Sequence, residues 1–161
     1  MRRELIRNKI KNMPGISYNE IRRQTNLSNG VLTHHIIQLL EKKEIEKEGK
    51  NRAKYFLKSI PKNDRKIITI LRNQTNNDIC KCIMNHGKDS MKVNDVILDT
   101  QEIAKNIKRS KSTISASLKV LQKNNVIERT IMGKKSKLKN DIGYKIVRER
   151  FFGNFLLKYK L

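Results

Sequence analysis

The chain has 161 residues, enough for one ordinary domain or for two small ones with modest cores. Its 37 Lys and Arg residues against 15 Asp and Glu give a formal net charge of +22, divided into +8 over residues 1–60 and +14 over residues 61–161. Because both halves are basic, the charge does not come from a single basic tail. It attracts polyanions, but membrane-surface and ribosomal proteins are basic too. No run of roughly 18 to 20 apolar residues predicts a membrane span, and the first residues do not open a signal peptide. We therefore expect a cytoplasmic protein without a membrane partner.

An amphipathic helix is predicted at the start of the chain. Its apolar stripe consists of Leu5, Ile6, Ile10 and Met13. The stripe ends at Pro14-Gly15, where proline and glycine stop a helix. This spacing suits a helix that packs behind the segment that follows.

A shift of the sequence by 82 residues aligns its two halves. Ser17 and Glu20 fall on Asp99 and Glu102. Each pair has the spacing of a capping box, in which a side-chain oxygen and a glutamate satisfy free N–H groups at a helix start. Two helices are therefore predicted to begin at matching points of the two halves.

A second helix is predicted about four residues after each of these first helices. In both copies a serine, Ser28 or Ser110, is predicted as the N-cap of an apolar run. The run has i, i+4, i+7 spacing, which marks one face of a helix over about 28–42 and 110–123. Two helices joined by so short a turn are typical of a helix-turn-helix. Asn26 suits a left-handed turn residue in the first copy, whereas Arg109 replaces an apolar residue in the second turn.

A hairpin pattern follows each second helix. Branched and aromatic residues flank basic turns in residues 45–48 and 53–57, and again in residues 127–132 and 142–147. A helix-turn-helix followed by a hairpin is a winged helix. The sequence therefore predicts a mainly α fold with small β-hairpin wings, built as two winged helix-turn-helix modules in tandem.

Further helices are predicted between the two modules. Pro61 begins a linker, in which a helix capped by Asp64 runs through Arg72. Residues 77–86 are predicted to form the first helix of module two, and residues 87–98 a loop with a short strand at 93–98.

The tail after Val147 is predicted to be an amphipathic helix, because apolar residues recur four apart at Val147, Phe151, Phe155 and Tyr159, beside Phe152 and Leu156. Three interpretations stay open: the helix folds back on its own module, pairs two chains as a homodimer, or binds an anionic membrane surface. The predicted organisation is module one over 1–60, a linker helix over 61–75, module two over 76–147 and a C-terminal amphipathic helix over 148–161.

Cys80 and Cys82 come without a second cysteine pair or a histidine array of zinc-site spacing, so we interpret them as structural or surface thiols. His34 and His35 have no acidic or cysteine partners nearby, which argues against a metal or pH sensor. We expect His34 to face DNA and His35 to pack beside Ile36. No cofactor or metal is expected.

A recognition helix in the major groove presents its N-terminal side chains to base edges. After the serines Ser28 and Ser110, the residues predicted to face outward are Asn29, Gly30, Thr33, His34 and Ile37 in module one, and Lys111, Ser112, Ser115, Ala116 and Lys119 in module two. Asn29 suits adenine and Lys111 suits guanine. Ala116 and Ile37 suit the methyl group of thymine.

Contacts to the DNA backbone are predicted at the helix starts and in the wings, where N–H groups and cations gather. These residues are Ser17, Tyr18, Arg22, Arg23, Lys50 and Arg52 in module one, and Thr100, Lys134, Lys135 and Lys137 in module two. Such contacts position a protein on DNA without reading its sequence.

The segments Pro14–Ile21 and Leu27–Ile36 resemble archaeal winged-helix transcriptional regulators of the ArsR and MarR type, and Ser110–Lys119 is similar to the recognition helix of the same group. The resemblance covers roughly residues 14–57 and 99–147, and implies gene regulation through DNA, commonly as a dimer. The metal-binding cysteine motif of ArsR-type sensors is absent near the first recognition helix, so metal sensing is not implied.

The expected partner is double-stranded DNA, and the expected function is that of a transcription regulator. Such a protein is expected to be associated with the nucleoid in the cytoplasm. A low-specificity architectural or chromatin protein is the alternative, because fold alone does not settle function. Two joined modules can imitate a dimer, and a homodimer through the C-terminal helix is the other arrangement. The sequence has no Gly-rich phosphate loop, nucleophile motif or paired carboxylates, so we do not expect an enzyme.

Overall fold

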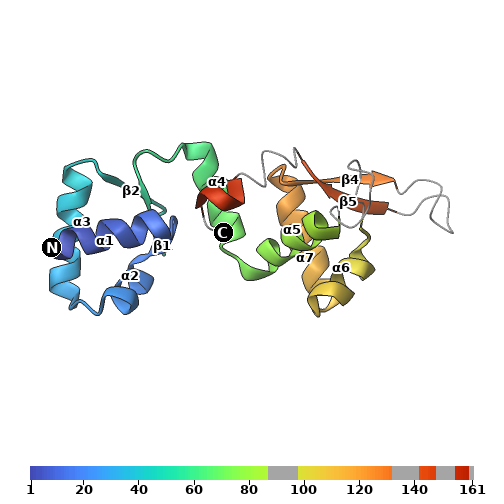
Figure 1. Ribbon diagram of the computed structural model, residues 1–161, viewed down its shortest axis with the longest axis horizontal. Helices are drawn as coiled ribbons and strands as arrows, with labels where there is room; N and C mark the ends of the chain where they lie inside the picture. The colour runs from blue at the N-terminus through green and yellow to red at the C-terminus, as the bar shows by residue number, and fades with distance from the viewer. Residues whose placement is uncertain (87–97, 132–141, 148–154, 160–161) are drawn as a thin grey trace. The chain divides into compact units, whose positions relative to one another are not determined.

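The computed structural model describes residues 1–86, 98–131, 142–147 and 155–159. Over these residues the chain is mainly helical, with two small antiparallel sheets (Figure 1). Contacts within the chain divide it into two units, Met1–Thr69 with Lys158–Leu161, and Ile70–Leu157. Among the described residues, no helix combines the length and the apolar character that crossing a membrane requires.

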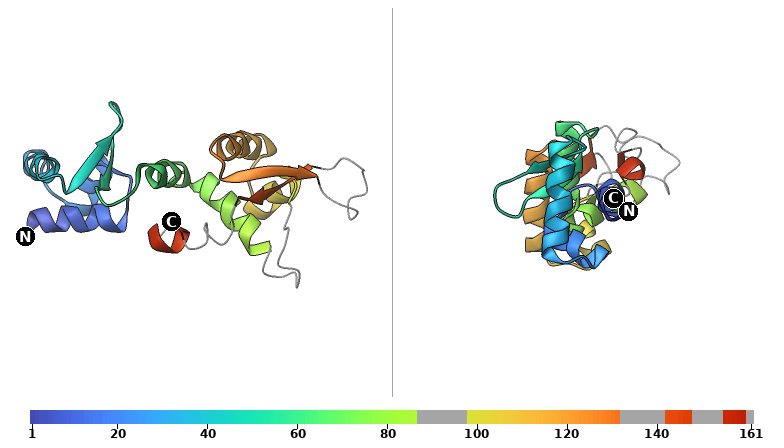
Figure 2. Two further views of the ribbon diagram at one scale, coloured as in Figure 1. Left: turned by 90° about the horizontal axis from the view of Figure 1, so that it is seen from above. Right: turned by 90° about the vertical axis from the view of Figure 1, so that its left-hand side faces the viewer.

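The first unit contains three helices and a three-stranded sheet. In chain order these are α1 (Arg2–Asn12), β1 (Ile16–Ser17), α2 (Tyr18–Thr25), α3 (Asn29–Glu41), β2 (Ile45–Glu48) and β3 (Lys54–Leu57). The strands are antiparallel in the order β1-β3-β2, and α1 packs against α2, α3 and β3. The hairpin of β2 and β3 projects beyond these helices in the left-hand view of Figure 2. The predicted first wing is therefore present, and the short strand β1 adds to it a pairing that the sequence did not indicate.

The core of the first unit is aliphatic and includes Ile6 and Ile10 of α1, both fully buried. These residues lie four apart on one face of the helix. Leu5 was predicted to share that face, but it is 41% exposed, because consecutive helical residues are rotated by about 100°. The N-terminal helix is thus confirmed and the position of Leu5 was wrong.

The turn between α2 and α3 has the predicted left-handed residue. Asn26 has φ 55° and its N–H donates to the carbonyl oxygen of Arg22. Ser17 and Glu20 form the expected capping box at the start of α2. Ser28 is the N-cap residue of α3, as predicted, but its side chain makes no capping hydrogen bond.

The second unit contains α5 (Gln74–His86), α6 (Thr100–Ile107), α7 (Lys111–Lys123), β4 (Ile127–Ile131) and β5 (Ile142–Ile146). The strands pair in antiparallel fashion, and α5 packs against α6, α7 and β5. Asn73 explains why α5 begins three residues before the predicted start at Asn77, because the Asn73 Oδ1 atom accepts a hydrogen bond from the N–H of Asn76 at 3.1 Å. Of the strand predicted at 93–98, Leu98 pairs with Tyr144 and the rest lies outside the described residues.

Backbone geometry recurs in the two units at the offset of 82 residues. Asn26 and Lys108 are both left-handed, with φ of 55° and 52°. Lys43 and Asn125, which follow α3 and α7, both have φ of 54°. Asp99 and Glu102 form a capping box as Ser17 and Glu20 do, and Leu98 occupies the place of Ile16 in strand pairing. The same local chain path is therefore adopted twice.

The linker helix α4 (Lys62–Leu71) begins three residues before the start that a cap at Asp64 predicts. Asp64 lies in its first turn instead of capping it. The Tyr159 hydroxyl donates to the Asp64 Oδ2 atom at 2.7 Å, and Tyr159 is 7% exposed. Residues 155–159 are helical and Phe155 is also buried. The tail thus contacts the linker helix α4, whereas the fold-back prediction named module two. Phe151 and Phe152 lie outside the described residues.

Arg65 joins α4 to the hairpin of the first unit. Its side chain is 3% exposed and donates hydrogen bonds to Glu46 and, at 3.2 Å, to Glu48 of β2. The Arg65 Nε atom also donates to the carbonyl oxygen of Ile60 at 2.7 Å, and the guanidinium lies 5.8 Å from the centre of the Phe56 ring. Burial disfavours the charge of Arg65, but its bonds to the two carboxylates outweigh this and raise its pKa.

The ion pair between Arg65 and Glu46 is expected to make the stability of the first unit fall at acid pH. The hydrogen bond from Arg65 lowers the pKa of Glu46 below its usual 4.5. The ionised Glu46 carboxylate therefore stabilises the folded state at pH values above its unfolded-state pKa. This stabilisation is lost as the pH falls through the lower pKa that Glu46 has in the folded state. We expect the stability difference between wild type and Glu46→Gln to shrink from pH 7 to pH 3, measured by urea unfolding.

Glu41→Gln is the control, because it removes the same charge from an exposed position of α3. A Glu46→Gln difference that stays constant across this pH range would contradict the role of the ion pair.

Candidate nucleic-acid interface

The helix α3 has one buried and one exposed face, as expected of a recognition helix. Leu32, Ile36 and Leu39 are at most 4% exposed and belong to the core. The predicted DNA-facing residues, Asn29, Gly30, Thr33, His34 and Ile37, are all exposed. The structure therefore places these five residues together on the solvent side of α3.

A hydrogen-bonded clamp connects α2 to the first turn of α3. The Tyr18 hydroxyl lies 3.0 Å from the carbonyl oxygen of Asn29, to which it donates, and 2.9 Å from the Thr33 Oγ1 atom. The Arg22 Nη1 atom donates to the Asn29 Oδ1 atom at 3.0 Å. Sequence analysis named all four residues as DNA contacts but did not indicate that they bind one another. We refer to Tyr18, Arg22, Asn29 and Thr33 as the α2–α3 clamp.

The clamp fixes the orientation of the Asn29 side-chain amide. Because the Oδ1 atom accepts from Arg22, the two N–H donors of the Nδ2 atom are directed away from that arginine. Arg23, the other predicted cation of α2, is exposed. The surface beside α3 thus combines oriented hydrogen-bond donors with positive charge.

The start of α2 and that of α6 offer fewer N–H groups than predicted. In α6 the Asp99 Oδ1 atom accepts from the N–H groups of Gln101 at 2.6 Å and of Glu102 at 2.7 Å. In α2 the Ser17 hydroxyl accepts from the N–H of Glu20. These N–H groups already have intramolecular partners, so the expected phosphate contacts at Ser17 and Thr100 are left with fewer donors.

The helix α7 repeats the division between a buried and an exposed face. Ile114, Leu118 and Leu121 are at most 1% exposed. Of the residues predicted to face DNA, Lys111, Ser112, Ala116 and Lys119 are exposed and Ser115 is half-buried. The Ser110 hydroxyl accepts from the N–H of Thr113 at 3.2 Å, so this predicted cap is confirmed.

The wing of the first unit carries its basic residues at its tip. Lys50 and Arg52 are exposed in the turn between β2 and β3. Gly49 has φ 88° in this turn, a backbone conformation that glycine adopts without strain. In the second wing the predicted contacts Lys134, Lys135 and Lys137 lie outside the described residues.

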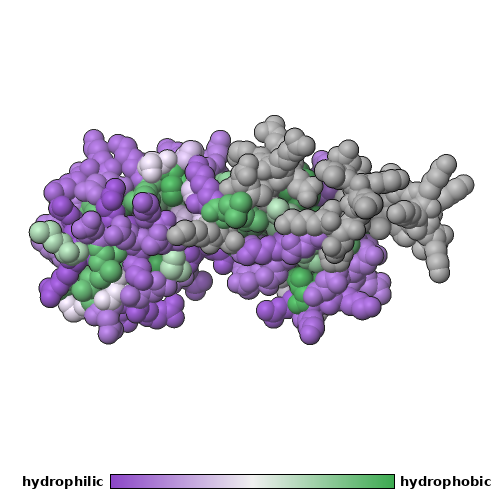
Figure 3. Space-filling view, in the orientation of Figure 1, coloured by the Kyte–Doolittle hydropathy of each residue, from purple (hydrophilic) through white to green (hydrophobic). Residues whose placement is uncertain are grey.

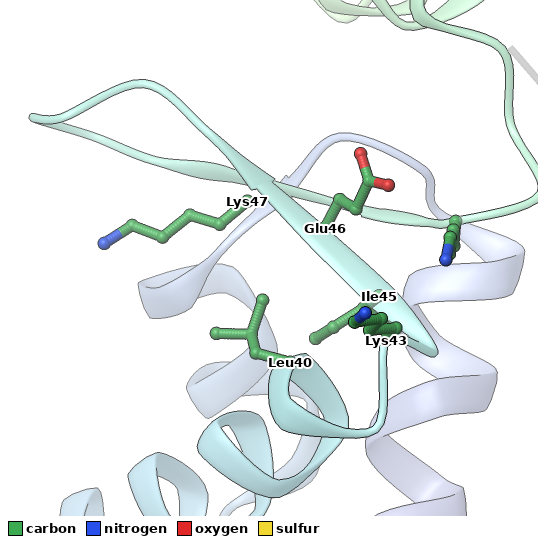
Figure 4. A pocket seen from close by; sticks show the side chains of 6 residues that line it. Leu40, Lys43, Ile45, Glu46 and Lys47 are labelled. Carbon is green, nitrogen blue, oxygen red and sulfur yellow. The ribbon is translucent and has the colours of Figure 1, made fainter.

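Sequence analysis missed a group of lysines at the end of α3. Lys43, Lys47 and Lys58 line a shallow hollow of about 350 Å³, together with Leu40, Ile45 and Glu46 (Figure 4). Lys47 alternates along β2 with Glu46 and Glu48, which are held by Arg65, so it leaves the strand on the opposite face. The alternation of acidic and basic residues along β2 could have predicted from the sequence that Lys47 lies on the face opposite Glu46 and Glu48. These lysines add positive charge close to α3.

The described surface is largely polar. Figure 3 shows hydrophilic residues over most of it on the face drawn there, with small hydrophobic patches between them. His34 is exposed and its ring lies 5.3 Å from the half-buried ring of His35, whose Nδ1 atom lies 3.3 Å from the Gln38 Oε1 atom. His34 is thus accessible from solvent, and its contact with DNA stays a prediction.

Both cysteines lie inside the second unit on α5. Burial raises the pKa of Cys80 to about 12 and also raises the pKa of Cys82. Both thiols therefore stay protonated at neutral pH, which suits the structural role proposed from the sequence.

Comparison with known proteins bears on the first unit. A family model described as HTH_HVO_0163_N, N-terminal HTH domain, matches residues 1–68. The first unit resembles a helix-turn-helix domain. The match ends one residue before the boundary of that unit at Thr69, and helix-turn-helix domains place their second helix, here α3, in the major groove of DNA. No curated protein matches the chain. The family match thus supports DNA as the partner of residues 1–68.

The α2–α3 clamp generates a direct test. Tyr18→Phe keeps the ring and removes the hydroxyl that contacts Asn29 and Thr33. We expect affinity for double-stranded DNA to fall about 2- to 10-fold, the usual worth of one hydrogen bond, when measured by fluorescence anisotropy with a labelled duplex.

Tyr159→Phe is the matched control, because it removes a hydroxyl that bonds Asp64, away from α3. Equal affinities of wild type and Tyr18→Phe, or equal losses in both variants, would exclude a role of the clamp in DNA binding.

Proposed function

We propose that this protein is a sequence-preferring transcription regulator, without enzymatic activity, that binds double-stranded DNA through two winged-helix modules. The first module corresponds to the unit that resembles a helix-turn-helix domain. The second uses α6 and α7, with the hairpin of β4 and β5 as its wing. In this proposal α3 and α7 enter the major groove, and the basic wings lie against the phosphate backbone.

One observation carries the proposal: the same backbone geometry occurs twice and leaves a polar helix face exposed each time. Left-handed residues end α2 and α6 at Asn26 and Lys108, and the following helix turns its apolar side inward in both units. A helix pressed into a groove needs small or polar residues on its outer side. Thr33 and Ser115 occupy equivalent positions there.

The net charge of +22 supports a polyanionic partner for the whole chain. It does not separate sequence-preferring binding from the uniform coating of an architectural protein. Hydrogen-bonding side chains on α3 support the first, since Asn29 presents donors to base edges. Because the two modules are covalently connected, a single chain can place both of them on one DNA site, as a dimer does.

Glutamate substitutions on the two helices test the proposal. Thr33→Glu and Ser115→Glu each place a negative charge where phosphates approach, so we expect each to weaken DNA binding about fivefold or more at low salt. Gel-shift titration of the full chain gives the affinities. The control is Asn63→Glu, which adds the same charge at an exposed position of α4.

If both variants bind DNA as tightly as the wild type, α3 and α7 do not lie in the major groove and the proposed DNA-binding mode is wrong. Selection of duplexes from a random pool then separates the two functions. A shared sequence among the selected duplexes supports a regulator, whereas binding of all duplexes alike supports an architectural protein.

A further inference from the structure

The two helix-turn-helix segments differ sharply in charge. Residues 18–41 contain two arginines and two glutamates, so their net charge is zero. The equivalent residues 100–123 contain five lysines and one arginine against one glutamate, a net charge of +5. The contrast extends to the recognition helices themselves, because α3 has no lysine or arginine and α7 has Lys111, Lys119 and Lys123.

The two segments also differ in how their outward residues are held. The α2–α3 clamp orients Asn29 through Arg22 and Tyr18. At the offset of 82, Thr100 replaces the tyrosine and Ala104 replaces the arginine. Alanine has no hydrogen-bonding side chain and threonine lacks the ring that carries the Tyr18 hydroxyl to α3. The second segment therefore cannot build the same clamp.

We propose that the two segments divide the work of DNA binding: α3 discriminates between sequences through the clamped Asn29, and α7 supplies affinity for any sequence through its lysines. This inference rests on the proposed function, and it identifies the residue that sets specificity at that site.

The Asn29 amide and the lysines of α7 differ in which parts of DNA they can recognise. The Nδ2 donors of Asn29, which the bond from Arg22 to Oδ1 leaves available, match the N7 acceptor of a purine, and the Oδ1 atom has a second lone pair for the N6 amino group of adenine. A fixed amide presents these groups without first losing rotational freedom. Lysine is a flexible point charge and is suited to phosphates, which are the same in every sequence.

Substitutions at equivalent positions test this division with matched pairs. Asn29 is equivalent to Lys111, and Ile37 to Lys119, and all four residues are exposed. We compare Asn29→Ala/Ile37→Ala with Lys111→Ala/Lys119→Ala in the full chain. For each variant, affinity is measured over a range of salt concentrations on a duplex selected from a random pool and on a scrambled duplex of equal length.

The first variant is expected to lower the affinity ratio of selected to scrambled duplex by roughly 5- to 150-fold and to leave the salt dependence unchanged. The second is expected to weaken both duplexes alike and to reduce the slope of log affinity against log salt by about 1.8, roughly 0.9 for each lost phosphate contact.

Loss of discrimination in the lysine variant, or an unchanged ratio in the Asn29 variant, overturns the division between the two helices. A wild-type chain that selects no sequence from the pool overturns the proposed function itself, so the two failures are distinguishable. Circular dichroism of each variant checks that the helices are retained, and an Asn29→Ala single variant repeats the test without the change at Ile37.

Discussion

The burial of one face of α3 is the constraint on which the rest of the first unit depends. Leu32, Ile36 and Leu39 insert into the core beside α1, and this fixes the rotation of the helix about its axis. The left-handed residue Asn26 fixes where the helix begins. With both set, the polar residues of the opposite face have to lie in solvent. A surface able to enter a groove is thus a consequence of packing, and the same logic holds for α7 in the second unit.

Two kinds of polar interaction bear on DNA binding, one of long range and one of short range. The charge of +22 attracts DNA from solution and is screened by salt, whereas the α2–α3 clamp acts only at contact. Two acidic residues of the wing strand, Glu46 and Glu48, share an ion pair with Arg65 of α4, which offsets part of their negative charge. The linker helix therefore fixes the acidic face of the wing, and Lys47 leaves β2 on the other side.

Much of this arrangement could be predicted because its causes are local. Capping boxes at Ser17 and Asp99 lie within four residues, and the apolar periodicity of α3 and α7 spans a few turns. Contacts that join distant residues were not predicted. Tyr18 reaches Thr33 across 15 positions and Arg65 reaches Glu46 across 19, and no local pattern specifies such pairs. The start of α5 was misplaced for a different reason, because its cap, Asn73, lies at the end of the linker where its role was overlooked.

The central claim, that α3 and α7 both lie in the major groove, is tested most directly by affinity cleavage. Gly30 and Ser112 are equivalent, exposed positions, and the native cysteines are buried with raised pKa values, so Gly30→Cys and Ser112→Cys can each be labelled selectively with an iron chelate. We expect localised cleavage of the selected duplex at two different places, one for each variant. Cleavage from Ser112→Cys that is spread evenly along the duplex, or that is absent, would contradict it.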